Sequence, residues 1–216
     1  MATRKKTAAP ASIVLFVRHG MTPTTGAVLP GRAKGLHLSP EGREQAEKVA
    51  ERLASLRGIT AVYASPLERT RETAAPIARA LGLRVRVERG LTECDFGAWT
   101  GRKLTELRRL PAWRTVQHHP SGFRFPEGES FVEMQTRVVT TIQRLVTEHA
   151  GSTIVVVSHA DPIKAAVAHA VGTHLDLFQR IVISPCSVTA IWYGSNGPAL
   201  LSANSTGDDL GQLTRS

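Results

Sequence analysis

Two apolar runs in the sequence end directly in a histidine. The run IVLFV leads into Arg18 and His19, and the run IVVVS leads into His159. A third run, AVYAS, leads into a helical pattern that carries Arg69 near its start. Guanidinium and imidazole groups gathered at one place suit a tetrahedral dianion such as phosphate, and a neutral imidazole is also a nucleophile. These residue types therefore predict phosphate binding or phosphoryl transfer.

Each of these residues also has a plainer interpretation. A lone histidine or arginine at the end of a strand is more often a solvated side chain than a catalytic group. The matched placement of His19 and His159, together with two arginines at equivalent positions, favours a shared site instead. Gly20 supports that interpretation, because glycine lets the backbone turn sharply and approach a ligand closely.

The elements that must hold these groups alternate between strand and helix patterns. This alternation predicts an α/β fold with three layers, α/β/α, in which a mostly parallel sheet carries helices on both faces. Ligands bind outside the carboxyl ends of the strands in such sheets, so the strand ends are expected to bring the cationic residues to one rim. The expected strands are residues 13–17, 59–63, 85–87, 154–157 and 188–193, with a short further run at 199–201.

The expected helices begin at recognisable capping residues. Ser39 and Ser65 each precede a proline that suits a first helical turn, and Ser130 opens a capping-box pattern. Asp161 also precedes a proline, so its carboxylate is expected to cap the helix that follows. Pro76 lies within the second helical pattern and is expected to kink or interrupt it.

The length of 216 residues predicts one catalytic domain between two terminal segments. Residues 1–11 form a basic leader, residues 12–203 form a single α/β domain, and residues 204–216 form a small polar tail; we expect both terminal segments to be disordered. Cys94 and Cys186 are far apart and predict neither a disulfide nor a zinc site. No apolar run reaches membrane-spanning length, so we expect a cytoplasmic protein, either a monomer or a homodimer.

The formal net charge of +9 indicates anionic partners. The Lys and Arg residues are spread over several predicted helices and form no long block. Aromatic residues make up only 5% of the chain, which provides little surface for stacking nucleobases. The distribution therefore favours a basic pocket for a small phosphorylated molecule, with no nucleic-acid partner and no membrane partner.

The motif VRHGMT resembles the Arg-His-Gly signature of the histidine phosphatase superfamily, the phosphoglycerate-mutase-like group. Five further segments resemble motifs of that family and follow in the same order: LSPEGREQA, SPLERTRETA, LTECDFGAWTG, PEGES and VSHADPIK. The resemblance covers residues 13–193. One Arg-His-Gly motif is a weak signal, whereas the ordered set is a strong one.

The resemblance implies that His19 is the nucleophile and forms a phosphohistidine intermediate. Arg18, Arg69 and His159 are implied to hold the oxygens of the transferring phosphoryl group, and Glu93 to protonate the leaving oxygen, so that these four residues contact the substrate as well. Physical chemistry agrees with these roles. Neighbouring guanidinium charges lower the pKa of a histidine toward the neutral nucleophile, and a nearby dianion raises the pKa of a carboxyl group toward the proton donor.

The resemblance also implies Thr25, Gly31 and Ala160 as substrate-binding residues, and at two places the sequence departs from the family pattern. Thr25 stands where many relatives have an asparagine that contacts the phosphoryl group. Ala160 and Asp161 stand where relatives often have Gly-Gly or Gly-Asn. Asp161 brings negative charge close to a phosphate site unless it caps a helix, and capping is the interpretation that we prefer.

The sequence therefore predicts a metal-independent phosphomonoester hydrolase of the histidine acid phosphatase type, which acts on a small phosphorylated metabolite and needs no cofactor. A cofactor-dependent phosphoglycerate mutase, or another phosphomutase, is the alternative, although residues 101–126 are short compared with the insertion that such mutases carry there. A non-catalytic binder of anions or nucleic acid is the minor alternative.

Several basic side chains and histidines outside the motifs stay unassigned. His118 and His119 lack carboxylate or cysteine partners at metal-ligand spacing, so we expect no metal site. Arg102, Lys103 and Arg124 lie in the segment 90–129, which is expected to cover the rim, and they are candidates for binding other anionic groups of the substrate.

Overall fold

A single mixed sheet forms the centre of the molecule in a computed structural model that describes residues 10–207. The strand order over these residues is β3-β2-β4-β1-β5-β6. β4 pairs in parallel with β1 and β2, β2 pairs in parallel with β3, and the antiparallel pairs β1/β5 and β5/β6 complete the sheet. The strands span Ser12–Arg18 (β1), Ile59–Ala64 (β2), Val85–Val87 (β3), Thr153–Ser158 (β4), Val188–Gly194 (β5) and Gly197–Ser205 (β6).

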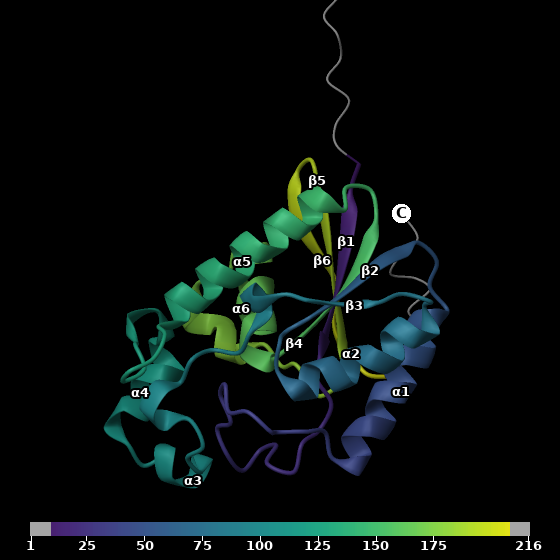
Figure 1. The fold of residues 1–216 in the computed structure, drawn as a ribbon. Helices are drawn as coiled ribbons and strands as arrows, with labels where there is room; N and C mark the ends of the chain where they lie inside the picture. Colours follow the sequence, from purple (N-terminus) through teal and green to yellow (C-terminus); the bar gives the residue numbers. More distant parts are fainter. Residues whose placement is uncertain (1–9, 208–216) are drawn as a thin grey trace, which may run out of the picture.

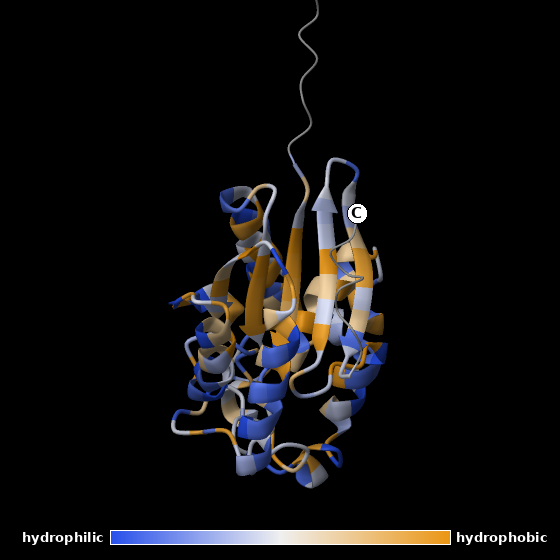
Figure 2. Ribbon diagram, turned by 90° about the vertical axis from the view of Figure 1, so that its right-hand side faces the viewer, coloured by the Kyte–Doolittle hydropathy of each residue, from blue (hydrophilic) through white to orange (hydrophobic). Residues whose placement is uncertain are grey.

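Helices cover both faces of the sheet, so the predicted three-layer α/β/α fold is confirmed (Figure 1). Alternate residues of β1 enter separate cores: Leu15 and Val17 pack with α1 and α2, whereas Val14 and Phe16 pack with α5 and α6. Figure 2 shows the hydrophobic strands between helices that carry many hydrophilic residues. The helices span Pro40–Ala54 (α1), Glu68–Ala80 (α2), Leu104–Leu107 (α3), Pro111–His118 (α4), Phe131–Glu148 (α5) and Ala160–Ala170 (α6).

Two of the predicted helix starts are confirmed. The Ser39 hydroxyl accepts a hydrogen bond from the Gly42 N–H at 3.0 Å and caps α1. Ser130 and Glu133 form the complete capping box of α5, because each side chain accepts a hydrogen bond from the other residue's backbone N–H. These caps satisfy N–H groups that a first helical turn leaves without a partner.

Two predicted helix caps are wrong, and one of two predicted effects of a proline is excluded. α2 begins at Glu68 with Leu67 as its N-cap, so Ser65 lies outside the helix. α6 begins at Ala160 with His159 as its N-cap, which places Asp161 inside the first turn instead of at the cap. α2 continues through Pro76 to Ala80, so Pro76 does not interrupt the helix; the buried face around Pro76 packs on the sheet and outweighs one missing hydrogen bond.

The segment 90–129 covers one side of the carboxyl edge of the sheet, as predicted, and it is more ordered than its composition suggests. It contains α3, α4 and the 3₁₀ turns Arg89–Leu91, Gly97–Trp99 and Pro120–Gly122. Aromatic rings fasten it to α5: Phe125 lies 4.8 Å from Phe96 and 5.2 Å from Phe131 between ring centroids. Aromatic packing of this kind adds to the hydrogen bonds of these short helices and turns.

The ends of the domain differ in part from the expected boundaries. β6 reaches Ser205, because its residues pair with β5 over a longer stretch than the apolar run 199–201 suggests. The expected tail therefore begins later than residue 204, and residues 1–9 and 208–216 of the two terminal segments lie outside the described residues. Within residues 10–207, no helix combines the length and the apolar character that crossing a bilayer requires.

Two glycines bring the exit of β1 against the start of α1. A Cβ added to Gly20 would lie 2.4 Å from the Gly42 carbonyl oxygen, and a Cβ added to Gly42 would lie 2.0 Å from the Met21 carbonyl oxygen. The backbones therefore touch with no room for a side chain. This contact fixes the direction in which the chain leaves β1, directly after His19.

Replacing Gly42 with alanine tests the backbone contact. Alanine gains up to about 1 kcal/mol over glycine in a helix interior, but overpacking against backbone costs about 1–3 kcal/mol. Gly42→Ala is expected to lower the free energy of unfolding, measured by urea denaturation. Glu44→Ala, on the exposed face of the same helix, is the control and should change it by less than about 0.5 kcal/mol. A more stable Gly42→Ala variant would contradict the contact.

Candidate active site

His19 follows the last residue of β1 and is buried. Its N–H continues the parallel ladder by donating to the Ser158 carbonyl of β4 at 3.0 Å. On the ring, Nδ1 lies 2.8 Å from the Gly20 carbonyl, and Nε2 lies 3.3 Å from Arg69 Nε. A carbonyl only accepts and a guanidinium only donates, so Nδ1 carries the proton and Nε2 keeps its lone pair.

The charge state of His19 agrees with this tautomer. Burial, followed by the positive charges of Arg69 and Arg18, holds the pKa of His19 well below its ordinary value. The imidazole is therefore neutral near pH 7, with an unprotonated Nε2. An imidazole in this state can act as a nucleophile.

Two guanidinium groups flank His19. Arg69, on the first turn of α2, is fully buried, and its Nη2 donates to the Gly31 carbonyl at 2.8 Å. Arg18, at the end of β1, donates from Nη1 to the Ile183 carbonyl at 2.7 Å. Neither arginine forms an ion pair with a carboxylate within the described part of the chain. Each guanidinium therefore keeps its positive charge available for a ligand.

His159 stands at the end of β4 and completes the group. Its ring is fully buried, and the ring centroids of His19 and His159 lie 5.2 Å apart. Ser65 Oγ lies 2.8 Å from His159 Nε2, which explains why Ser65 is not a helix cap. We call Arg18, His19, Arg69 and His159 the cationic cup.

The cationic cup contains three buried nitrogen atoms without a hydrogen-bond partner among residues 10–207. They are Arg18 Nε, Arg69 Nη1 and His159 Nδ1, which come from three different elements. Buried donors without partners are costly, and native proteins rarely keep several of them together. An anion with several acceptor oxygens would satisfy them together, so the cup has the chemistry of a phosphate site.

Glu93 provides an acidic group beside the cup. Its carboxylate is buried, accepts a hydrogen bond from the Cys94 N–H at 3.0 Å, and places Oε2 3.9 Å from His159 Nδ1. Burial, followed by the negative charge of Asp161, raises the pKa of Glu93 to about 7, against the opposing effect of Arg69. Glu93 can therefore hold or release a proton near neutral pH. Asp161, which does not cap α6, acts on this group instead.

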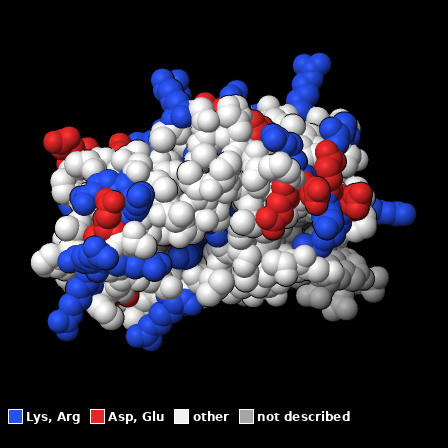
Figure 3. Space-filling model, turned by 90° about the horizontal axis from the view of Figure 1, so that it is seen from below, with Lys and Arg blue, Asp and Glu red and all other residues white. Residues whose placement is uncertain are grey.

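A cavity of about 310 Å³ is lined in part by Asp161, whose charge acts on Glu93 and Arg18, although none of the four cup residues lines it. Phe96, three residues after Glu93, and Asp161, two residues after His159, both line it. Its apolar side includes Leu29 and Trp113, and Lys164 lies on the polar side, 3.6 Å from the Asp161 carboxylate. Figure 3 looks onto this end of the molecule and shows Lys and Arg side chains around its edge.

The structure brings together the five residues predicted as catalytic, and two of the three further predicted substrate contacts lie next to them. Gly31 adjoins the cup through its carbonyl group, and Ala160 is the first residue of α6. Thr25 differs, because its hydroxyl group accepts a hydrogen bond from the Thr22 N–H at 2.9 Å and so closes a local turn. No described contact connects Thr25 with the cup.

The unassigned basic residues lie away from the cup. His119 pairs with Asp176 at 3.0 Å, and His118 is exposed at the end of α4. Within residues 10–207, no group of three or more His, Cys, Asp or Glu side chains has an arrangement that could hold a metal ion. Arg124 is exposed and pairs with Glu133 of the capping box. Arg102 and Lys103 precede α3, and no described side-chain contact links them to the cup.

Comparison with known families agrees with this geometry. A family model described as histidine phosphatase superfamily (branch 1) matches residues 14–206. The chain belongs to the histidine phosphatase superfamily. The resemblance seen in the sequence motifs is thus confirmed over nearly the whole described chain.

Individual members of the superfamily show how far the similarity reaches. A bifunctional protein of Mycobacterium tuberculosis is 33% identical over 196 residues, which are 90% of this chain and 54% of that protein, so the chain spans about half of that relative. Phosphoserine phosphatase 1 of Hydrogenobacter thermophilus is 32% identical over 181 residues, 82% of this chain and 85% of that protein. Mycobacterial glucosyl-3-phosphoglycerate phosphatase has the same fold, with a TM-score of 0.82, 24% identity and coverage of 90% of this chain and 99% of that chain.

Sequence reasoning missed several residues that this histidine phosphatase fold places around the site. Ser65 was expected to cap a helix and instead contacts His159. Arg32, Glu129 and Arg137 surround the backbone of Glu93, although they are far apart in the sequence. In the sequence, only the PEGES motif pointed to Glu129. No sequence pattern pointed to Arg32 or Arg137 as residues near the site.

The raised pKa of Glu93 generates a prediction about stability. A carboxyl group whose pKa is higher in the folded chain binds more protons there, so the free energy of unfolding falls as pH rises from about 4.5 through about 7. Glu93→Gln removes this loss. The free energy of unfolding of Glu93→Gln minus that of the wild type should therefore be more positive at pH 8 than at pH 5, by on the order of 2–3 kcal/mol.

Urea denaturation of both proteins at pH 5 and pH 8 measures this difference. Glu133→Gln is the matched control, because hydrogen bonds and the charge of Arg124 lower the pKa of Glu133 to about 2. That group loses its contribution only on acidification, so its difference from the wild type should be the same at pH 5 and pH 8. A pH-independent difference for Glu93→Gln would refute the buried, protonated carboxyl group.

Proposed function

We propose that this protein is a phosphomonoester hydrolase that acts through a phosphohistidine at His19. The observation that supports this most strongly is the set of three buried nitrogen donors without partners beside the unprotonated Nε2 of His19. The similarity to phosphoserine phosphatase 1 of Hydrogenobacter thermophilus supports the same reaction class. A simple anion binder would not need a neutral nucleophile and a protonated carboxyl group beside the same cup.

In the first step, His19 Nε2 attacks the phosphorus atom, and the bond from phosphorus to the leaving oxygen breaks. Arg18, Arg69 and His159 hold the phosphoryl oxygens and balance the charge that develops on them. The Nδ1–H bond to the Gly20 carbonyl fixes the ring and stabilises the positive charge that the imidazole gains. Ser65 donates its hydroxyl hydrogen to His159 Nε2, which leaves Nδ1–H free to donate to the phosphoryl group.

Glu93 transfers the proton in both steps. Its carboxyl group donates a proton to the leaving oxygen, so that the alcohol departs neutral and Glu93 becomes a carboxylate. In the second step the carboxylate accepts a proton from water, whose oxygen attacks the phosphorus atom while the bond from His19 breaks. Inorganic phosphate forms, and the enzyme returns to its initial state.

The proposed substrate is a small phosphorylated metabolite whose leaving group extends toward the cavity beside Asp161. The apolar side of the cavity suits a carbon skeleton, and Lys164 suits a polar or anionic substituent. The relatives differ in the substrates that their names give, so the fold alone does not select one. A panel of phosphorylated metabolites, assayed with and without bisphosphoglycerate, separates hydrolase from mutase activity.

The covalent step predicts a labelled intermediate at His19. Wild-type protein given ³²P-labelled substrate and denatured at alkaline pH, where phosphohistidine survives, should carry label on His19. His19→Ala should lose both the label and turnover, because no nucleophile remains. His118→Ala, which changes an exposed histidine outside the site, is the control and should retain both. Normal turnover by a folded His19→Ala variant would exclude the covalent mechanism.

Proton donation by Glu93 predicts a dependence on the leaving group. In single-turnover measurements of phosphorylation, Glu93→Gln should slow the reaction of an alkyl phosphate by roughly 10²–10⁴-fold. An aryl phosphate with an acidic phenol needs little protonation and should react nearly as fast as with the wild type. Arg69→Ala serves as the comparison and should slow both substrates about equally, because charge neutralisation assists any leaving group. Equal losses on both substrates in Glu93→Gln would leave Glu93 without the donor role.

A further inference from the structure

The turn that carries Glu93, residues 92–96, contains neither helix nor strand. A proton donor must nevertheless hold its position relative to the reacting atoms within a fraction of an ångström. The hydrogen bonds of a regular element cannot provide that precision here. Other groups must therefore fix this turn, which we call the Glu93 turn.

Two arginines bind the backbone on both sides of Glu93. Arg137 of α5 donates from Nη1 to the Gly90 carbonyl at 2.8 Å and to the Thr92 carbonyl at 2.9 Å. Arg32, from the loop after β1, donates from Nε to the Glu93 carbonyl at 2.9 Å. The turn is thus held between a helix and a loop that come from distant parts of the sequence.

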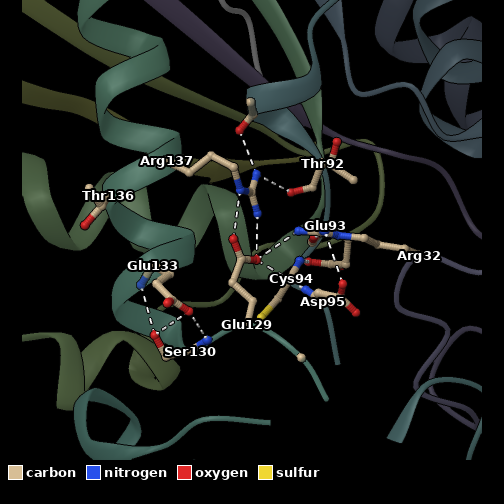
Figure 4. Close-up of polar contacts among 12 residues, drawn as sticks. Arg32, Thr92, Glu93, Cys94, Asp95, Glu129, Ser130, Glu133, Thr136 and Arg137 are labelled. Atoms are coloured by element: carbon tan, nitrogen blue, oxygen red, sulfur yellow. Dashed lines mark hydrogen bonds and ion pairs between the residues drawn. The ribbon is translucent and has the colours of Figure 1, made fainter. Parts of the chain in front are cut away.

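Glu129 connects both arginines and contacts the turn itself (Figure 4). Its Oε1 accepts from Arg137 Nε at 2.9 Å, and its Oε2 accepts from Arg137 Nη2 at 2.9 Å and from Arg32 Nη2 at 3.0 Å. Oε2 also accepts from the Asp95 N–H at 3.3 Å, and the Glu129 N–H donates to the Asp95 carbonyl at 2.9 Å. The side chain of Glu129 is only 13% exposed, so solvent cannot readily replace these contacts.

We propose that Glu129 is a positioning residue for the proton donor Glu93, an inference that rests on the proposed function of Glu93. Its carboxylate keeps two guanidinium groups beside the turn and orients them toward the Gly90, Thr92 and Glu93 carbonyl groups. Without that negative charge, Arg137 has no carboxylate partner within residues 10–207, and Arg32 keeps only Asp95, at 3.3 Å. The contacts of both guanidinium groups with the carbonyl groups beside Glu93 are then weakened together.

Arg32 also links the Glu93 turn to the cationic cup. It follows Gly31, whose carbonyl accepts the hydrogen bond from Arg69. One short stretch of chain therefore contacts a guanidinium group of the cup with its backbone and the Glu93 turn with its side chain. Through Arg32, Glu129 sets the donor relative to the atoms that hold the phosphoryl group.

The experiment compares Glu129→Gln with the wild type on an alkyl phosphate and on an aryl phosphate with an acidic phenol, both in single turnover. Phosphorylation by the alkyl phosphate should slow on the order of 10²-fold, because a displaced donor is a poor one. Phosphorylation by the aryl phosphate should change little. The alkaline limb of the alkyl pH–rate profile should also move to lower pH, because a loosened turn exposes the Glu93 carboxyl group to water.

A double variant separates positioning from a general structural effect. Glu93→Gln combined with Glu129→Gln should be no slower on the alkyl phosphate than Glu93→Gln alone, because the donor is already absent. Glu133→Gln is the matched control. It removes a carboxylate four residues away that pairs with Arg124 and caps α5, so it should lower stability and leave the alkyl-to-aryl rate ratio unchanged.

Arg32→Met provides a second test if Glu129→Gln fails to fold. The Arg32 side chain is 35% exposed, so its removal disturbs the core less, and it should reduce the alkyl rate selectively but by a smaller factor. Equal losses on both substrates, or a double variant slower than Glu93→Gln, would overturn the role of Glu129. Equal losses in Glu93→Gln itself would instead overturn the donor role of Glu93, so the two failures are distinguishable.

Discussion

The structure depends on burying the guanidinium and imidazole groups of the cationic cup while some of their nitrogen atoms have no hydrogen-bond partner among the described residues. Arg69 is fully buried, and three nitrogen atoms of the cationic cup find no partner within residues 10–207. Each such atom costs about 1–3 kcal/mol. The two hydrophobic cores on either face of the sheet offset this cost. A bound anion would supply hydrogen-bond acceptors for these nitrogen atoms and so remove this cost.

Much of the fold and of the cup could be predicted from the sequence, because both depend on local patterns. Each apolar run of strand length became a strand, and the carboxyl ends of parallel strands necessarily meet at one edge of a sheet. Residues that directly follow those runs, His19 and His159, are therefore placed by the topology itself. The family motifs added Glu93, whose position follows no strand and could not have been derived from periodicity.

The failures have a common physical cause, which is competition from distant contacts. Ser65 has the sequence of a helix cap, yet a histidine almost a hundred residues later takes its hydroxyl group. Asp161 has the sequence of a cap, yet the preceding His159 already occupies that position. The supports of the Glu93 turn come from the loop after β1 and from α5. A local pattern cannot reveal partners that only the folded chain brings together.

The Glu93 turn and the cationic cup are secured in different ways. Most of the cup is attached to strand ends and a helix, whereas the turn depends on the side chains of Arg32, Glu129 and Arg137. Regions without regular hydrogen bonding open at a smaller free energy than the sheet does. The proposed proton donor and the proposed anion site therefore differ in their resistance to local unfolding. We expect heating to open the Glu93 turn before the sheet, which leaves a molecule that still binds an anion in the cup but lacks the proposed proton donor.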